Sequence, residues 1–96
     1  MIIAEISFSV IGEGSSIGPF VRLAVNELKK SGLKTVSGPN STSIEAATID
    51  EILNATKAAH VAVVGAGAKR VVTTVKIDDR RDKPATMESK IKAVNC

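Results

Sequence analysis

The chain has 96 residues, a formal net charge of +3 at pH 7, 44% hydrophobic residues and 24% charged residues. This composition is typical of one globular domain spanning residues 1–96, and it excludes a disordered chain. The apolar runs are too short to cross a bilayer and the N-terminus lacks a basic leader, so we expect a cytoplasmic protein without membrane contact. Phe8 and Phe20 are the only aromatic residues, which argues against a nucleic-acid partner because single-stranded bases stack on aromatic side chains.

The first predicted elements are a strand and a helix joined by a loop rich in glycine and serine. In residues 2–11, every second side chain is apolar and the side chains between them are mixed, a pattern typical of a half-buried β-strand. A helix is expected from Pro19, because proline at the first helical position loses no hydrogen bond. The loop at residues 12–18 could bind an anion beside the helix N-terminus. However, it lacks the lysine of a phosphate-binding loop and the glycine spacing of a dinucleotide site, so a simple connector is the better interpretation.

The second half of the chain repeats this order of elements. A short strand at residues 34–37 leads into Gly38-Pro39-Asn40, a strong turn signal, and a strand follows at residues 41–46. Thr48 and Glu51 predict a capping box at the start of the next helix. Its expected buried stripe is Ile49, Ile52, Thr56, Ala59 and Val63, flanked by Leu53 and His60. A β-branched strand at residues 70–78 and a short helix with the apolar stripe Met87, Ile91 and Val94 complete the chain.

We expect no metal site. His60 is the only histidine and is interpreted as a structural residue at the edge of the core. Cys96 is the only cysteine, so it can form neither an internal disulfide nor a cysteine-rich metal site. The acidic and basic side chains of residues 78–82 interleave without the spaced oxygen ligands of a calcium loop. They fit either a subunit contact or a solvated strand end, and we expect Asp78 and Arg80 to act at subunit contacts.

The order of elements predicts an α+β fold, the ferredoxin-like βαββαβ sandwich, with a four-stranded antiparallel sheet and an extra C-terminal helix. Strands 2–11 and 41–46 should lie in the middle of the sheet, and both longer helices should cover one face. The loops at residues 12–18, 38–42 and 65–69 then emerge at one end. Ser15, Ser16, Asn40 and Thr42 should converge there, forming a candidate small-molecule site.

The alternation of the strand at residues 41–46 assigns its side chains to opposite faces. Thr42 has the parity of Ile44 and should point beneath the first helix, whereas Glu45 should lie on the far face unless a bulge reverses it. That far face carries a broad patch of apolar and small polar side chains on the strands at residues 2–11 and 70–78: Ile3, Ser7, Ser9, Val72 and Thr74. We therefore expect sheet-to-sheet packing in a homotetramer built as a dimer of dimers.

Several segments together resemble the small thiamine-binding protein family. They are residues 2–6, the loop with Ser15-Ser16, Phe20-Val21, the turn from Gly38 to Glu45, and the run from Arg70 to Arg81, which contains the most specific part, Lys-Ile-Asp-Asp-Arg. The resemblance covers nearly the whole chain. It implies a ferredoxin-like homotetramer that binds thiamine, or its hydroxymethylpyrimidine portion, without catalysis and without a cofactor. One departure is Gly18-Pro19, where relatives tend to carry a hydroxyl residue.

The candidate ligand-binding residues are Ser15, Ser16, Asn40, Thr42 and Glu45. Two other functions remain open for the same fold. An acylphosphatase needs an arginine in the first loop, but the nearest one, Arg22, lies within the predicted helix, so we expect no enzyme activity. The stronger alternative is an ACT-like regulatory module that binds an amino acid. Such a module is usually attached to an enzyme, whereas we expect this chain to be complete.

Overall fold

The computed structural model describes residues 1–14 and 17–95, so Ser15, Ser16 and Cys96 lie outside the described residues. The order of elements confirms the predicted βαββαβ arrangement with an added C-terminal helix. The elements are β1 (Ile2–Val10), α1 (Gly18–Lys30), β2 (Lys34–Ser37), β3 (Thr42–Ala46), α2 (Ile49–Gly65), β4 (Val71–Asp78) and α3 (Met87–Val94). Among the described residues, none of the helices has the length and apolar character needed to span a bilayer.

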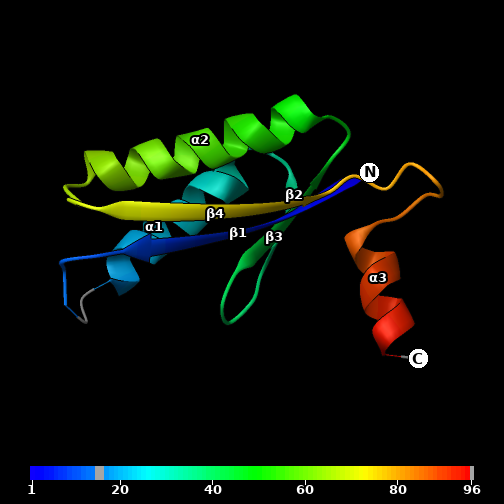
Figure 1. Cartoon of the computed structure of the whole chain (residues 1–96), viewed down its shortest axis with the longest axis horizontal. Helices are drawn as coiled ribbons and strands as arrows, with labels where there is room; N and C mark the ends of the chain where they lie inside the picture. Colours follow the sequence, from blue (N-terminus) through cyan, green and yellow to red (C-terminus); the bar gives the residue numbers. More distant parts are fainter. Residues whose placement is uncertain (15–16, 96) are drawn as a thin grey trace.

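The four strands form one antiparallel sheet in the order β2-β3-β1-β4, which is the predicted ferredoxin-like topology. Ile6 of β1 lies opposite Thr42 of β3, and Val10 lies opposite Val71 of β4. Figure 1 shows α1 and α2 on one side of the sheet, while α3 stands apart near the start of β1. This register places the β2–β3 turn beside the middle of β1.

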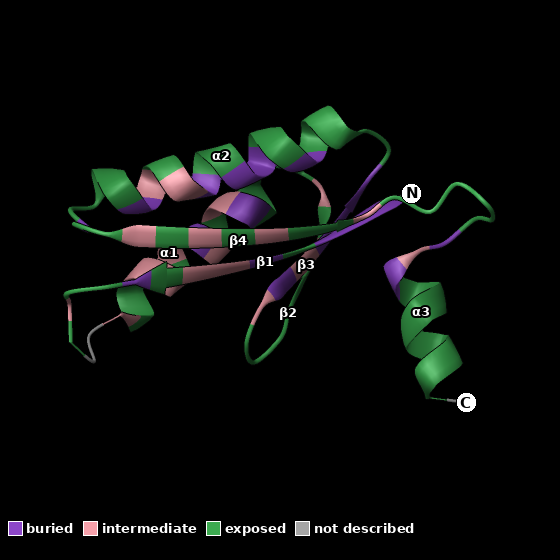
Figure 2. Ribbon diagram, in the orientation of Figure 1, coloured by how far each residue is buried: buried purple, intermediate pink, exposed green. Residues whose placement is uncertain are grey.

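The core lies between the sheet and the two long helices. Figure 2 shows the buried stripe of α2 facing the strands. The largest fully buried side chains are Ile6, Leu28, Ile44, Ile52 and Val63. Each such side chain stabilises the fold by about 1.5–3 kcal/mol relative to exposure. The helix layer is thereby fixed against one face of the sheet, which sets the position of every loop between them.

The start of α2 shows one success and one error of the sequence interpretation. The predicted capping box is present: Glu51 N donates to Thr48 Oγ1 at 3.3 Å, and Thr48 N donates to Glu51 Oε1 at 3.2 Å. The predicted burial of Ile49 is wrong, because its side chain is 40% exposed and Ala55 is buried instead. The cause is α1, which packs on the Ala55 side of α2 and turns the buried arc away from Ile49.

α3 covers part of the sheet face that α1 and α2 leave free. Met87 is buried, and together with Ile91 it faces Ile3, Val36 and Ser43 across a small cavity. The predicted apolar stripe is only partly buried, since Ile91 is 51% exposed and Val94 is 82% exposed. Two ion pairs hold the N-terminal half of the helix: Lys90 pairs with Asp78, and Glu88 Oε2 lies 3.9 Å from Lys34 Nζ. α3 is therefore attached more loosely than α1 or α2.

Candidate functional site

A tight turn between β2 and β3 builds the candidate site. Gly38 N donates to Ser41 O at 2.8 Å, and the turn passes through Pro39 and Asn40. A Cβ on Gly38 would lie 3.2 Å from Ser41 O, so glycine allows this close approach. Proline fixes its own φ for the bend. The turn predicted from the sequence is thus present, and it holds Asn40 next to Thr42.

A cleft of about 240 Å³ lies between this turn, the middle of β1 and the first half of α1, and we call it the hairpin cleft. Its lining residues are Ile6, Ser7, Phe8, Val21, Val25, Ser37, Gly38, Pro39, Asn40, Ser41 and Thr42. None of them carries a formal charge. The lining combines an apolar wall with hydroxyl and amide groups, which suits a small flat ligand with a few polar atoms.

Thr42 is the most distinctive residue of the hairpin cleft. It is 5% exposed and shares the helix-facing side of β3 with the fully buried Ile44, as its parity predicted. Its hydroxyl group has no hydrogen-bond partner among the described residues, although most buried polar groups have one. Thr42 lines the hairpin cleft, next to Asn40 and Ser41. It can donate or accept a hydrogen bond there.

The structure brings together only some of the residues that were predicted to bind a ligand. Asn40 and Thr42 both line the hairpin cleft, and Asn40 lies exposed on the turn. Phe8 supplies an aromatic wall, whereas Phe20 packs beside the core and is not part of the lining. Ser15 and Ser16 lie outside the described residues. The cleft therefore has two of the predicted hydrogen-bonding side chains and one aromatic ring.

Glu45 lies away from the hairpin cleft, on the opposite face of the sheet. It is 5% exposed, and its Oε1 lies 3.8 Å from Lys34 Nζ. It lines a separate cavity of about 410 Å³, whose walls also include Met1, Lys34 and Thr86. The parity argument for Glu45 is confirmed, since no bulge turns its side chain toward Thr42.

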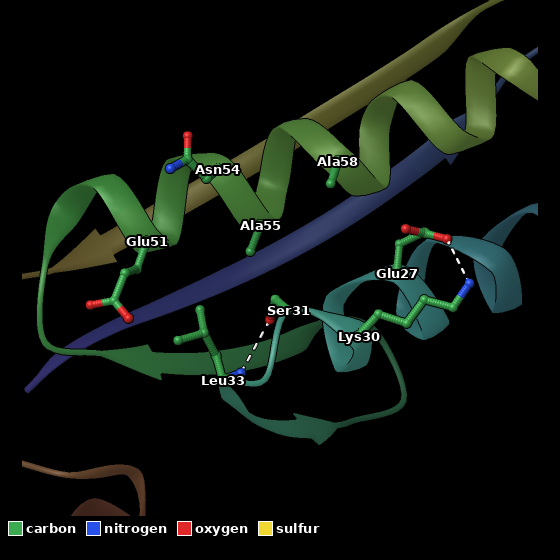
Figure 3. Close-up of a pocket in the computed structure, with 8 residues that line it drawn as sticks. All are labelled: Glu27, Lys30, Ser31, Leu33, Glu51, Asn54, Ala55 and Ala58. Carbon is green, nitrogen blue, oxygen red and sulfur yellow. Dashed lines mark hydrogen bonds and ion pairs between the residues drawn. The ribbon is translucent and has the colours of Figure 1, made fainter.

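A second depression, which we call the interhelix groove, lies between α1 and α2 and has a volume of about 350 Å³ (Figure 3). Its lining residues are Glu27, Lys30, Ser31, Leu33, Glu51, Asn54, Ala55 and Ala58. The sequence interpretation missed this groove because it depends on how the two helices pack. Its polar groups largely bind one another: Lys30 Nζ lies 3.2 Å from Glu27 Oε1, and Leu33 N donates to Ser31 Oγ at 3.2 Å. It offers a ligand fewer free groups than the hairpin cleft.

Charged residues cluster where β4 ends, beside the start of β1. The Lys90 ammonium group hydrogen-bonds to Asp78 and lowers the pKa of that carboxyl group. Arg80 Nε donates to Asp82 Oδ1 at 2.7 Å, which raises the pKa of Arg80 and lowers the pKa of Asp82. Because Ile3, at the start of β1, lies opposite Asp78, this cluster is remote from the hairpin cleft. The role of Asp78 and Arg80 at subunit contacts stays a prediction.

His60 joins α2 to the sheet. Its Nδ1 lies 2.6 Å from Thr73 Oγ1 of β4, and the side chain is half-buried. This contact agrees with the structural role expected for the histidine. The described residues also contain no group of three or more His, Cys, Asp or Glu side chains arranged to hold a metal ion.

Comparison with known sequences gives consistent matches along the whole chain. A model of the family described as thiamine-binding protein matches residues 4–95. A UPF0045 protein of Methanothermobacter thermautotrophicus is 42% identical over 95 residues, which cover 98% of this chain and 96% of that protein. A UPF0045 protein of Methanocaldococcus jannaschii is 40% identical over 93 residues, which cover 97% of this chain and 91% of the relative.

Solved structures confirm the fold. A hypothetical protein from Methanocaldococcus jannaschii superposes with a TM-score of 0.90 and 39% identity, covering 98% of this chain and 95% of the other. A putative thiamine biosynthesis/salvage protein from Thermotoga maritima superposes with a TM-score of 0.83, covering 97% of each chain. Its sequence is 22% identical, so this likeness supports the fold alone.

Proposed function

Because this chain belongs to the thiamine-binding protein family, we propose that it binds thiamine, or the hydroxymethylpyrimidine portion of thiamine, in the hairpin cleft. The observation that supports this site most directly is the Thr42 hydroxyl group, which is nearly buried, has no partner among the described residues and lies in the lining of the cleft. The neighbouring Asn40 and Phe8 supply the other groups that the ligand needs.

The chemistry of the aminopyrimidine ring matches this lining. The ring is flat and mostly apolar, with one amino donor group and two ring nitrogens that accept hydrogen bonds. The Thr42 hydroxyl and the Asn40 amide can each donate or accept, so they can satisfy both kinds of group. Phe8 provides a surface against which the ring can lie. Ser15 and Ser16, in the loop that precedes α1, are proposed as further partners.

The size of the hairpin cleft favours one ring over the whole vitamin. Its volume of about 240 Å³ is below the roughly 300–1,000 Å³ of most drug-sized ligand pockets. The pyrimidine can therefore occupy the cleft while the thiazolium ring extends toward solvent. Glu45 takes no part in this proposal, because its side chain lies on the opposite face of the sheet.

We propose binding without catalysis. The described lining residues include no carboxylate, histidine, lysine or cysteine that could act as a general acid, a general base or an activated nucleophile. We also propose a cytoplasmic homotetramer. The exposed sheet face supports self-association, since Ser9, Val72 and Thr74 lie side by side on it without a covering helix.

An amino-acid ligand, as in an ACT-like module, is less favoured by the same lining. An amino acid carries an ammonium and a carboxylate group, and neither would meet an opposite charge among the residues that line the hairpin cleft. Scanning fluorimetry with thiamine, the pyrimidine and a panel of amino acids separates the two functions. A ligand at 100 times its Kd stabilises the folded protein by about 2.7 kcal/mol.

Calorimetry with the variant Thr42→Val tests the proposed site. Valine keeps the shape of threonine but removes the hydroxyl group, so the free energy of thiamine binding should weaken by about 1–3 kcal/mol, roughly 5- to 150-fold in Kd. Ser43→Ala is the matched control, because Ser43 is the next residue of β3 and faces the other side of the sheet.

Two results would count against this proposal. If the parent protein bound neither thiamine nor the pyrimidine at micromolar concentration, the function would be wrong. If thiamine bound with equal affinity to the parent and to Thr42→Val, the function would stand and the site would lie elsewhere, with the interhelix groove as the next candidate.

A further inference from the structure

A second cavity lies at the end of the sheet where β1 and β2 begin, and we call it the Glu45 cavity. It has a volume of about 410 Å³, and its walls include Met1, Lys34, Glu45 and Thr86. Lys34 and Glu45 are direct partners across β2 and β3. Thr86 comes just before α3, which lies near the start of β1 in Figure 1. The β2–β3 turn that builds the hairpin cleft is at the other end of the same two strands, so the two sites are separate.

The carboxylate of Glu45 is buried without a hydrogen bond from the described residues. Its side chain is only 6% exposed, and Oε1 lies 3.8 Å from Lys34 Nζ, which is too long for a hydrogen bond. Removing a charged group from water is costly unless hydrogen bonds replace the lost hydration, so buried carboxylates normally accept several of them. Glu45 therefore lines the cavity with acceptor capacity that this part of the chain does not use.

Lys34 offers the matching donor. Its Nζ lies 3.9 Å from Glu88 Oε2 as well as 3.8 Å from Glu45, and neither distance is a hydrogen bond, although an ammonium group has three N–H donors. Glu51 also lines the cavity, but its Oε1 already accepts from Thr48 N at 3.2 Å and from Thr48 Oγ1 at 3.0 Å. Within the described lining, one carboxylate and one ammonium group thus remain for a ligand.

We propose that the Glu45 cavity binds a free α-amino acid with an apolar side chain. The ammonium group of the amino acid donates to Glu45, and its carboxylate accepts from Lys34. The four charges then alternate in sign, so that each lies beside an opposite charge. Leu33 and Ala46 give the cavity an apolar wall for the side chain of the ligand. The volume of about 410 Å³ falls within the roughly 300–1,000 Å³ of common ligand pockets.

Other classes of ligand fit this pair of groups less well. The thiazolium ring of thiamine is a cation without an N–H group on the charged nitrogen, so it cannot donate a hydrogen bond to Glu45. A simple carboxylate would leave Glu45 without a donor. A metal ion would need more ligands, and the described residues contain no suitable cluster. The inference goes beyond the proposed function, because it adds a ligand of another class at a site that thiamine does not use.

Calorimetry with three related probes tests the need for both charges. The probes are L-leucine, isopentylamine, which lacks the carboxylate of leucine, and isocaproate, which lacks its amino group. We expect the parent protein to bind L-leucine. Each of the other two should bind roughly 10- to 150-fold more weakly, because each loses a hydrogen bond between charged groups.

Variants of the two charged residues test the location. Glu45→Gln keeps the shape of the side chain, and Lys34→Met keeps most of its length. Each should weaken L-leucine binding by roughly 10- to 150-fold. Lys29→Met is the matched control, since it removes the same charge from an exposed residue outside the described lining of the cavity. Thr42→Val should leave the affinity for L-leucine unchanged, and Glu45→Gln should leave the affinity for thiamine unchanged.

Hydrogen exchange gives a second measurement. The amide of Lys90 donates to Thr86 O at 3.1 Å in the first turn of α3, and Thr86 lines the cavity. L-leucine should therefore raise the protection factor of the Lys90 amide in the parent protein. It should have no such effect at the same concentration in Glu45→Gln. Increased protection in both proteins would mean that leucine acts on α3 from another place.

Three results would overturn the proposal. If L-leucine did not bind the parent at millimolar concentration, the cavity would not be an amino-acid site. If isopentylamine bound as tightly as L-leucine, Lys34 would have no role and the ligand would be a simple amine. If Thr42→Val weakened leucine binding while Glu45→Gln did not, leucine would occupy the hairpin cleft. The first two results would leave the thiamine proposal intact, since its test uses thiamine and the hairpin cleft.

Discussion

Thr42 and Glu45 lie three residues apart in β3 and are equally buried, each 5% exposed, yet their surroundings differ. Thr42 faces the helix layer and lines the hairpin cleft, and its hydroxyl group has no hydrogen-bond partner among the residues that the structure describes. Glu45 faces the other side of the sheet, where Lys34 Nζ lies 3.8 Å away. Buried polar groups normally have partners. A nearly buried polar group without a partner among the described residues is therefore a better sign of a ligand site than burial alone.

The largest expected effect is on stability, and it comes from Ile44, which lies between Thr42 and Glu45 in β3 and faces the helices. Ile44→Ala should destabilise the protein by about 2–5 kcal/mol, because it removes a fully buried side chain and leaves a cavity. Urea unfolding measures the change. Ser43→Ala, on the other face of the same strand, should stay within about 0.5 kcal/mol of the parent. Equal losses in the two variants would mean that the two faces are not as different as the structure indicates.

A charge on the exposed sheet face should separate subunits without unfolding them. Ser9→Lys places an ammonium group opposite Val72, in the patch proposed for sheet-to-sheet packing. Like charges brought together by two packed copies are strongly unfavourable, so light scattering at micromolar concentration should show a lower mass. Asn54→Lys, in the helix layer, is the control. If Ser9→Lys kept the parent mass, this face would not be an interface.

Removing the charge of Glu45 should have a small effect. Glu45→Gln keeps the shape of the side chain and loses only its attraction to Lys34, whose side chain is 54% exposed, so the free energy of unfolding should change by less than about 1 kcal/mol. Thiamine affinity should stay within about twofold of the parent value, in contrast to Thr42→Val. A calorimetric loss as large as that of Thr42→Val would show that Glu45 contacts the ligand.

The smallest expected effect is a pH-dependent loosening of α3. The hydrogen bond from Lys90 holds the pKa of Asp78 below its ordinary value of 3.8. The contribution of this pair to stability is therefore complete above that ordinary value, and it is lost as the pH falls through the lower pKa of the folded state. Hydrogen exchange should show a smaller protection factor for the amide of Ile91, measured against the intrinsic exchange rate at each pH, at low pH and also in Asp78→Asn at neutral pH. Unchanged protection in Asp78→Asn would mean that the Lys90–Asp78 pair does not help to hold the helix.

Local patterns were sufficient to predict much of this fold. The period of two in β1, the Gly38-Pro39-Asn40 turn and the Thr48–Glu51 capping box depend on residues close in sequence, and all three are confirmed. The position of Thr42 also follows from the regular alternation of a short strand. Such features need no knowledge of the neighbouring elements.

Features set by packing between distant elements were not predictable in the same way. The burial of Ala55 in place of Ile49 depends on the side of α2 against which α1 packs. The same packing creates the interhelix groove. The chain has two aromatic residues, Phe8 and Phe20, and the structure places Phe8 in the cleft because β1 runs beside the turn. Two of the predicted ligand residues, Ser15 and Ser16, lie outside the described residues.

The central place of β1 has a consequence for biosynthesis. β1 is the first strand to leave the ribosome, but its two neighbours in the sheet are β3 and β4, and β4 ends at Asp78. The isoleucines of β1, which are buried in the folded protein, therefore stay exposed until most of the chain has been synthesised. Pairings between segments distant in sequence form slowly, and unpaired apolar strands are prone to aggregate. Nascent chains of this protein should be most dependent on chaperones just before β4 emerges.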